Sequence, residues 1–186
     1  MTEITDHNES AAKTQFILYW GDMGGQWGVN RSVAQIQALL FLSAVPLNAE
    51  QISDQLGIAR SNVSNSLKEL VSWKLISRIP MPGDRREYFE AETDVWEIAK
   101  RVAQGRKERE IDPAIRVLAD CVAAAQSEDK PDVVALARMK DMQEFLNTVD
   151  SWYGQMLTVP KSKLNILLKM GNKVISLLSL TGKKSE

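Results

Sequence analysis

The segment QISDQLGIARSNVSNSLKEL, residues 51–70, contains the pattern that decides the fold. Apolar residues at positions 63, 67, 70 and 71 recur at helical spacing and predict an amphipathic helix from Ala59 to Trp73. A shorter helix, AEQISDQL (residues 49–56), precedes it, with Asn48 as its N-cap and Gly57 as the residue that ends it. Two helices joined by a tight turn that contains glycine predict a helix-turn-helix.

The outward face of the second helix is rich in short polar side chains. Serine and asparagine favour helix less than Glu, Lys, Gln or Ala, so their presence requires a reason. A helix in the major groove of DNA reads base edges with residues near its N-terminus, where Asn suits adenine and Arg suits guanine. The candidate DNA-binding residues are Arg60, Ser61, Asn62, Ser64, Asn65 and Lys68. The alternative is a solvated helix on which these side chains are incidental.

A β-hairpin is expected directly after this helix. LISRI (residues 75–79) is β-branched, PMPGDRR (residues 80–86) is a Pro/Gly turn, and EYFEAE (residues 87–92) alternates apolar with acidic residues as a returning strand. A hairpin that follows a helix-turn-helix predicts a winged helix.

The tip of this hairpin is basic. Arg85 and Arg86 are candidates for contacts with the minor groove or with phosphates, and Asp84 can orient one of them. The alternative is a turn that its charges keep soluble. The whole chain has a net charge of −1, but residues 58–86 carry six basic and only two acidic side chains. Such a local patch steers a polyanion more than the total charge does.

The rest of the sequence predicts further helices. A first helix is expected from about Ser10 to Met23, where GDMGGQWG ends it, and others at Arg31–Ala44 and from Thr93 to about Glu110. The next helix is expected to have Asp112 as its N-cap and Pro113 as its first residue. Two more are expected from Pro131 to about Leu157 and after Pro160. The expected fold is mainly α with a small β-hairpin: a winged helix-turn-helix domain plus a C-terminal helical dimerisation region. The expected division is 1–30, 31–109 and 110–186.

Two stretches resemble the GbsR/MarR-like family of bacterial winged-helix transcriptional regulators. They are NAEQISDQLGIARSNVSNSLKELVSWKLISRI (residues 48–79) and PGDRREYFEAETDVWEI (residues 82–98), and the resemblance extends over residues 20–118. It implies a homodimer, an operator with two half-sites and control of transcription. It also implies that the candidate residues named above lie on the recognition helix and the wing. Many relatives place serine where this chain has Ala59, so the N-cap of the helix is expected to be weak.

The C-terminal third is expected to form the dimer. LNILLKMGNKVISLLSL (residues 164–180) is too apolar to be exposed, yet too short and too interrupted by lysines to span a bilayer. Packing within a helical dimer is favoured over a helix on a membrane surface. The single Cys121 cannot form an internal disulfide, and no apolar signal segment is evident, so a cytoplasmic protein without a membrane partner is expected.

Trp20 and Trp27 flank the glycine-rich bend and are candidates for binding a small-molecule effector. Aromatic side chains hold quaternary ammonium ligands by cation–π attraction, and some members of the resembled family are associated with choline and betaine metabolism. The alternative is that these aromatic side chains fill gaps in the core.

The sequence gives little support for catalysis. Its only histidine, His7, lies in a polar N-terminal stretch, and neither a phosphate-binding loop nor a Cys/His spacing typical of a metal site is evident. No enzyme, metal or cofactor is therefore expected. The competing hypothesis to DNA binding is a winged-helix module that binds another protein.

Overall fold

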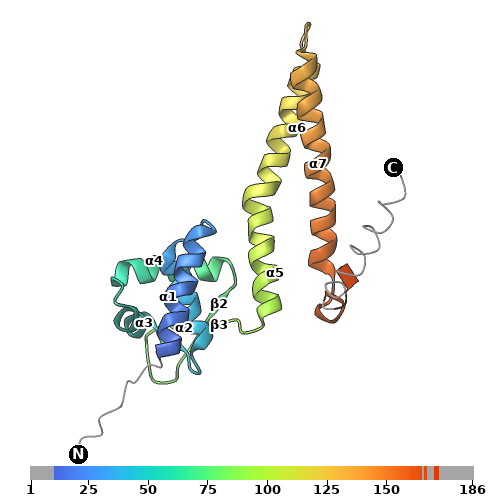
Figure 1. Ribbon diagram of the computed structural model, residues 1–186. Helices are drawn as coiled ribbons and strands as arrows, with labels where there is room; N and C mark the ends of the chain where they lie inside the picture. The colour runs from blue at the N-terminus through green and yellow to red at the C-terminus, as the bar shows by residue number, and fades with distance from the viewer. Residues whose placement is uncertain (1–10, 165, 167–169, 172–186) are drawn as a thin grey trace, which may run out of the picture. The chain divides into compact units, whose positions relative to one another are not determined.

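The computed structural model describes residues 11–164, 166, 170 and 171. The chain divides into two compact units, and the boundary, between Val102 and Ala103, falls inside helix α5 (Val95–Arg106). The first unit holds α1–α4 and a small sheet, and the second is helical (Figure 1). The architecture is therefore mainly α with a winged-helix arrangement, as predicted. The expected division into 1–30, 31–109 and 110–186 concerns the roles of the segments and stays a prediction.

The core of the first unit is built around the second helix. Its helices are α1 (Ala11–Gln26), α2 (Arg31–Leu42), α3 (Ala49–Leu56) and α4 (Arg60–Ser72). Both α1 and α4 pack on α2, and for this reason α2 is apolar on more than one side. Ile36 of α2, Ile52 of α3 and Val63 of α4 are fully buried in one hydrophobic cluster. This cluster fixes which face of α4 remains exposed.

The helix-turn-helix has the caps that the sequence predicts. The Asn48 side chain accepts hydrogen bonds from the backbone N–H groups of Glu50 and Gln51, and the Gln51 side chain accepts from the Asn48 backbone N–H. Gly57 ends α3 in the left-handed conformation at φ +62°, which glycine adopts without steric cost. Ala59 precedes α4 and makes no side-chain cap hydrogen bond, which confirms the expected weak cap.

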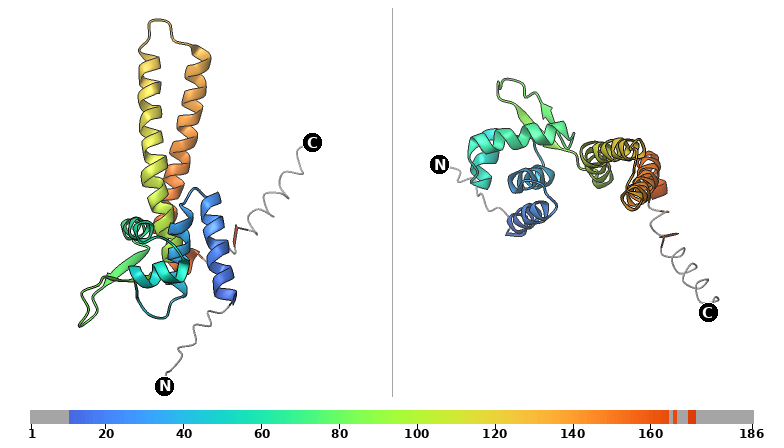
Figure 2. Two further views of the ribbon diagram at one scale, coloured as in Figure 1. Left: turned by 90° about the vertical axis from the view of Figure 1, so that its left-hand side faces the viewer. Right: turned by 90° about the horizontal axis from the view of Figure 1, so that it is seen from above.

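The hairpin of the wing is present, and a third strand joins it. Strands β2 (Ile76–Ile79) and β3 (Tyr88–Ala91) are antiparallel, and Gly83 takes φ +81° in the turn between them. Strand β1 (Leu47–Asn48) pairs with the other edge of β3, giving the order β1-β3-β2. The hairpin projects away from the helices of its unit (Figure 2). A strand of two residues leaves no alternating pattern, so β1 was not predicted.

The glycine-rich stretch GDMGGQWG (residues 21–28) ends the first helix as predicted, but the helix ends at Gln26 and not near Met23. Helix α1 runs on to Gln26, and Gly28, at φ +76°, lies beyond its end. Gly24 is buried against α2, where an added Cβ would come within 2.5 Å of the Ala34 Cβ. Glycine therefore serves here to bring two helices close together.

From Ala103 onward, the second unit contains a helical segment that includes the end of α5, followed by an antiparallel helix. Helix α5 passes through a π-helical turn (Lys107–Ile111) into α6 (Asp112–Gln126), and α7 (Val133–Thr158) lies beside α6 (Figures 1 and 2). Asp132 caps α7, so the helix predicted from Pro131 is confirmed with a shift of two residues.

The predicted N-cap role of Asp112 is wrong. Asp112 has helical dihedral angles, and its carboxylate is 2.6 Å from Lys107 Nζ, which is also 2.7 Å from Asp150 of α7. These hydrogen bonds, the one to Asp112 foremost, raise the pKa of Lys107. Pro113 lacks an N–H and crowds the carbonyl four residues back, and a π-helical turn accommodates both within a continuous helix.

The last predicted helix lies mostly outside the described residues. Residues 161–164 are helical, and the backbone N–H groups of Lys163 and Leu164 donate to the Pro160 carbonyl. In the described part of the chain, no helix combines the length and the apolar character needed to cross a bilayer.

Candidate nucleic-acid interface

Helix α4 presents every polar residue that the sequence singled out. Val63, Leu67 and Leu70 are buried and Val71 packs partly buried against them, so the opposite face of the helix is turned to solvent. The exposed side chains on that face are Arg60, Ser61, Asn62, Ser64, Asn65 and Lys68. They occupy the first two and a half turns, where a helix that enters a groove makes its base contacts.

Two of these side chains have partners on other helices. The Asn62 amide donates to the Ser32 hydroxyl at the start of α2, at 2.9 Å, and Arg60 is hydrogen-bonded to the Glu50 carboxylate on α3. Asn65 and Lys68 make no hydrogen bond or ion pair with any other described residue. The exposed face therefore combines fixed and free side chains.

The wing is braced by its own arginine. Arg86 Nε lies 2.9 Å from Asp84 Oδ2, and the Tyr88 hydroxyl donates to the same oxygen at 2.8 Å. The Arg86 guanidinium also lies over the Tyr88 ring, 5.8 Å from its centroid. Hydrogen bonds from Arg86 and Tyr88 hold the pKa of Asp84 well below its usual range, and Asp84 raises the pKa of Arg86. The predicted pairing of Asp84 with a wing arginine is present.

Arg85 differs from its neighbour. Its side chain is exposed and has no ion pair or hydrogen-bond partner among the described residues. An unpaired guanidinium at the tip of a projecting hairpin is available for an external anion.

A hollow of about 360 Å³ lies between the start of α3, helix α4 and the hairpin. Lys68, Arg78 and Arg86 are among the basic side chains on its walls, and Glu50 and Glu87 are the acidic ones. Arg78 pairs with Glu87 at 3.2 Å across the two strands. Helix α4 and the hairpin thus share one charged, solvent-facing surface.

A sequence profile of the MarR family matches residues 27–87, the span from the end of α1 to the start of β3. Residues 27–87 are therefore similar in sequence to the winged helix of the MarR family. The match ends before the second unit and does not distinguish the GbsR subfamily.

Several solved structures are similar to this chain at low sequence identity. A crystal structure of a transcriptional regulator is similar to this chain with a TM-score of 0.62 and 16% identity, over 78% of this chain and 95% of that one. Two others have TM-scores of 0.37. They are a MepR variant of Staphylococcus aureus bound to an oligodeoxyribonucleotide (16% identity; 74% and 90% covered) and a transcriptional regulator from Thermotoga maritima (17% identity; 79% and 92% covered). No curated protein matches the chain significantly.

Sequence reasoning missed three residues of this surface: Ser32, Glu50 and Tyr88. Ser32 is 30 positions from its partner Asn62, and Glu50 is 10 positions from Arg60. Neither spacing belongs to a helix or a hairpin, so no local pattern connects the partners. Tyr88 lies in the strand that the sequence predicts, and nothing in the strand pattern reveals a hydrogen bond to Asp84.

The two candidate effector residues lie on and beyond α1. Trp20 is partly buried and stacks on Phe16, with ring centroids 5.4 Å apart, and it packs against the hydrophobic cluster. Trp27 is 61% exposed. Neither lines the hollow beside the recognition helix. The packing of Trp20 favours the alternative in which it fills the core, while an effector site at Trp27 stays a prediction.

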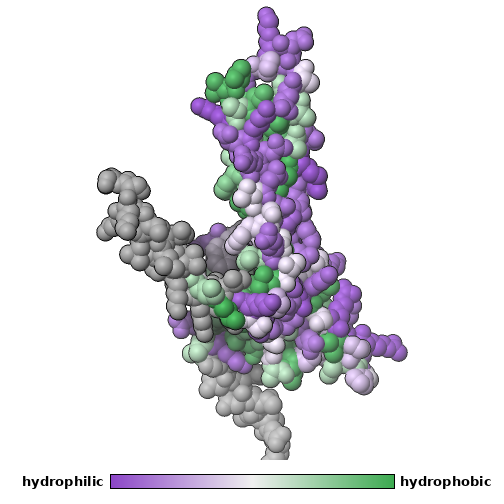
Figure 3. Space-filling model, turned by 90° about the vertical axis from the view of Figure 1, so that its right-hand side faces the viewer, coloured by the Kyte–Doolittle hydropathy of each residue, from purple (hydrophilic) through white to green (hydrophobic). Residues whose placement is uncertain are grey.

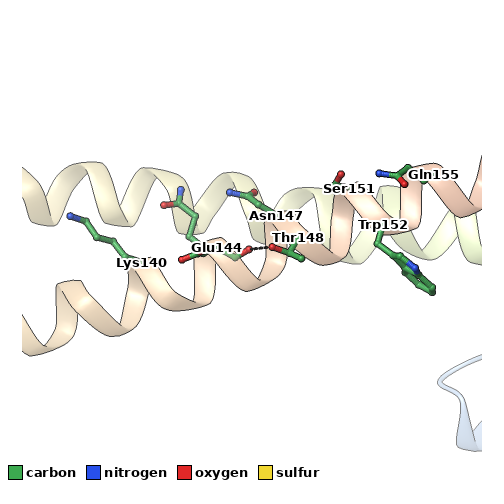
Figure 4. A pocket seen from close by; sticks show the side chains of 8 residues that line it. Lys140, Glu144, Asn147, Thr148, Ser151, Trp152 and Gln155 are labelled. Atoms are coloured by element: carbon green, nitrogen blue, oxygen red, sulfur yellow. Dashed lines mark hydrogen bonds between the residues drawn. The ribbon is translucent and has the colours of Figure 1, made fainter. Parts of the chain in front are cut away.

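A second hollow lies along α7 in the other unit, with a volume of about 630 Å³ (Figure 4). All of its lining side chains come from this one helix, among them Lys140, Asn147 and Gln155, and the Thr148 hydroxyl donates to the Glu144 carbonyl at 2.8 Å. Apart from Trp152, the lining side chains are polar, so the hollow follows the hydrophilic face of the helix. Among the described residues, no group of three or more His, Cys, Asp or Glu side chains is arranged to hold a metal ion.

Proposed function

We propose that this protein is a sequence-specific DNA-binding transcriptional regulator of the GbsR/MarR-like type. It acts as a homodimer on a pseudo-palindromic operator, with α4 in the major groove and the wing on the backbone or in the minor groove. The observation that carries this proposal is the polar face of α4 in a MarR-family winged helix, where six candidate residues are exposed together. The protein acts by binding and performs no catalytic step.

The exposed surface offers an uncharged side chain suited to base contacts and charged side chains suited to phosphate contacts. Asn65 is short, forked and without a partner among the described residues, which suits a bidentate contact with adenine. Lys68 and Arg85 are exposed cations, likewise unpaired in the described part, and suit phosphates. Phosphate contacts set the register of the protein on the duplex, while base contacts select the sequence.

The homodimer rests on exposed apolar side chains of the second unit. On α7, Met142, Phe145, Val149 and Trp152 are spaced by three, four and three residues. Val149 is partly buried, and the other three are exposed, Phe145 to 62%. This spacing is that of a coiled-coil seam, and the seam lacks a partner among the described residues. Hydrophobic patches interrupt the hydrophilic surface of the helices (Figure 3).

Helix α6 carries a matching seam. Ala114, Val117, Cys121 and Ala124 have the same spacing and are exposed, while Val122 is buried against α7. Around the axis of each helix, the seam lies on the order of 100° away from the residues that face the other helix. Viewed from the N-terminus of each helix, the direction of this rotation is the same for α6 and α7. Because the helices are antiparallel, both seams lie on one side of the hairpin. Two copies joined through that side form a four-helix arrangement.

A two-fold homodimer presents two recognition helices, which suits an operator with two half-sites. A small-molecule effector near Trp27 would act by favouring one dimer geometry over another. A cytoplasmic location follows from the proposed DNA partner. The effector, its site and the location stay predictions.

Selection of DNA by the purified chain tests the proposal. From a random-sequence library, the full-length protein should enrich a pseudo-palindrome, and heparin should retain the protein in a salt-dependent manner despite its net charge of −1. If no sequence is enriched and retention does not depend on salt, the winged-helix module that binds another protein becomes the better hypothesis.

A further inference from the structure

Glu50 connects the recognition helix to the wing. Its carboxylate accepts a hydrogen bond from Arg60 Nη2, at the first residue of α4, and its other oxygen lies 3.7 Å from Arg86 Nη1. Arg86 is in turn held by Asp84 at the hairpin turn. A single acidic side chain therefore contacts two of the proposed DNA-binding arginines.

The position of Glu50 is well defined. It lies in the first turn of α3, where its backbone N–H donates to Asn48 Oδ1 at 3.0 Å, and Asn48 is buried at 2% exposure. An acidic side chain is also stabilised there by the helix dipole. The Glu50 carboxylate thus extends from a fixed backbone.

The Glu50 contact leaves part of the Arg60 guanidinium available. Arginine has five N–H donors in a planar fork, and the ion pair engages the Nη2 group. A restrained arginine loses less conformational freedom when it binds a base edge than a free one does. An unrestrained arginine on the same helix instead reaches whichever phosphate is near, and phosphate contacts carry no sequence information.

We infer that Glu50 is a specificity-determining residue of the proposed DNA site. It positions Arg60 for a base edge and withholds it from phosphates of unrelated sequences. This inference rests on the proposed function. It does not concern stability, because the pair is exposed (69% for Arg60 and 46% for Glu50) and exposed ion pairs contribute little to folding.

The test compares Glu50→Gln with the parent chain on two duplexes, the one that the full-length parent selects and a scrambled version of it. Glu50→Gln should bind the scrambled duplex more tightly and reduce discrimination between the duplexes by about fivefold or more. Because Arg60 becomes free to contact a phosphate, the slope of log affinity against log salt on the scrambled duplex should steepen by about 0.9. The melting temperature should change little, because the ion pairs of Glu50 are exposed.

Two further variants test whether an effect of Glu50→Gln comes from the positioning of Arg60 or only from the loss of one negative charge. Glu90→Gln removes the same charge from an exposed site on β3 that has no partner among the described residues, and it should leave discrimination unchanged. Arg60→Lys keeps the positive charge but loses the planar fork. In the Arg60→Lys background, Glu50→Gln should reduce discrimination no further.

The outcomes are distinguishable. If the parent chain discriminates and Glu50→Gln discriminates equally well, the role of Glu50 is rejected while the proposed function stands. Equal weakening on both duplexes would assign Glu50 a merely structural role and also reject the inference. If the parent chain itself selects no sequence, the proposed function fails and this inference fails with it.

Discussion

The Asn62 side chain donates a 2.9 Å hydrogen bond to the Ser32 hydroxyl, joining the first turn of the recognition helix to the first turn of α2. The backbone N–H of Ser32 donates in turn to the side chain of Asn30, the N-cap of α2. The two asparagines of α4 are therefore not equivalent. Asn62 is hydrogen-bonded to Ser32 in the free chain, while Asn65 has no side-chain partner among the described residues.

This difference leads to a prediction for the reading of bases. Asn65→Ala and Asn62→Ala should each weaken binding to the selected duplex by roughly 1–3 kcal/mol and spare a scrambled duplex, because each removes a base contact. Ser32→Ala removes only the anchor, so its loss should be smaller than that of Asn62→Ala. Fluorescence anisotropy on both duplexes measures these effects. Unchanged affinity in both asparagine variants would show that α4 does not read bases.

Lys68 should anchor the protein without selecting a sequence. Lys68→Ala should weaken binding to both duplexes alike and flatten the dependence of log affinity on log salt by about 0.9, since one phosphate contact is lost. The measurement is a salt titration of affinity. Lys13→Ala, which removes an exposed charge from α1, is the matched control and should leave the slope unchanged. A loss confined to the selected duplex would instead make Lys68 a base-reading residue.

Replacing either wing arginine by alanine should have a different effect on hydrogen exchange and on DNA binding. Arg86→Ala removes the partner of Asp84 and Tyr88, so backbone amides of the hairpin should exchange hydrogen faster in the free protein. Arg85→Ala should leave exchange unchanged and affect only DNA binding. A loss that depends on A/T content would place Arg85 in the minor groove. Equal exchange in both variants would contradict the bracing role of Arg86.

The wing should remain intact in mild acid. Hydrogen bonds from Arg86 and Tyr88 hold the pKa of Asp84 below the ordinary value of 3.8, so the unfolded chain binds more protons than the folded chain between the two values. The stabilisation is fully present above pH 3.8 and is lost as the pH falls through the folded pKa. The ¹³C shift of the Asp84 carboxyl should therefore show no titration near pH 3.8. In Arg86→Ala the titration should move up toward that value.

The apolar seam on α7 should mediate dimerisation. Phe145→Glu places a charge on a side chain that is 62% exposed, so the protomer should still fold while light scattering reports a monomer. Binding to a duplex with two half-sites should weaken accordingly. Asn147→Glu adds the same charge on the hydrophilic face of the helix (Figure 4) and should remain dimeric. A dimeric Phe145→Glu protein would move the interface elsewhere.

Features whose cause lies within a few residues could be predicted from the sequence alone. The Asn48 cap, the turn at Gly57, the polar outward face of α4 and the hairpin with its Asp84–Arg86 pair all arise from local spacing and intrinsic backbone preference. Hydrophobic periodicity then determines which side of a helix is buried, and so which polar side remains exposed.

Only the tertiary structure decided the features that depend on distant partners. Gly24 continues α1 because α2 lies close against it, and β1 forms because β3 offers a free edge. Glu50 meets Arg60 only after the turn between α3 and α4 brings their first turns together, and Asn62 meets Ser32 through the packing of α4 on α2. Each contact depends on the packing of whole elements, which the spacing of residues along one element does not specify.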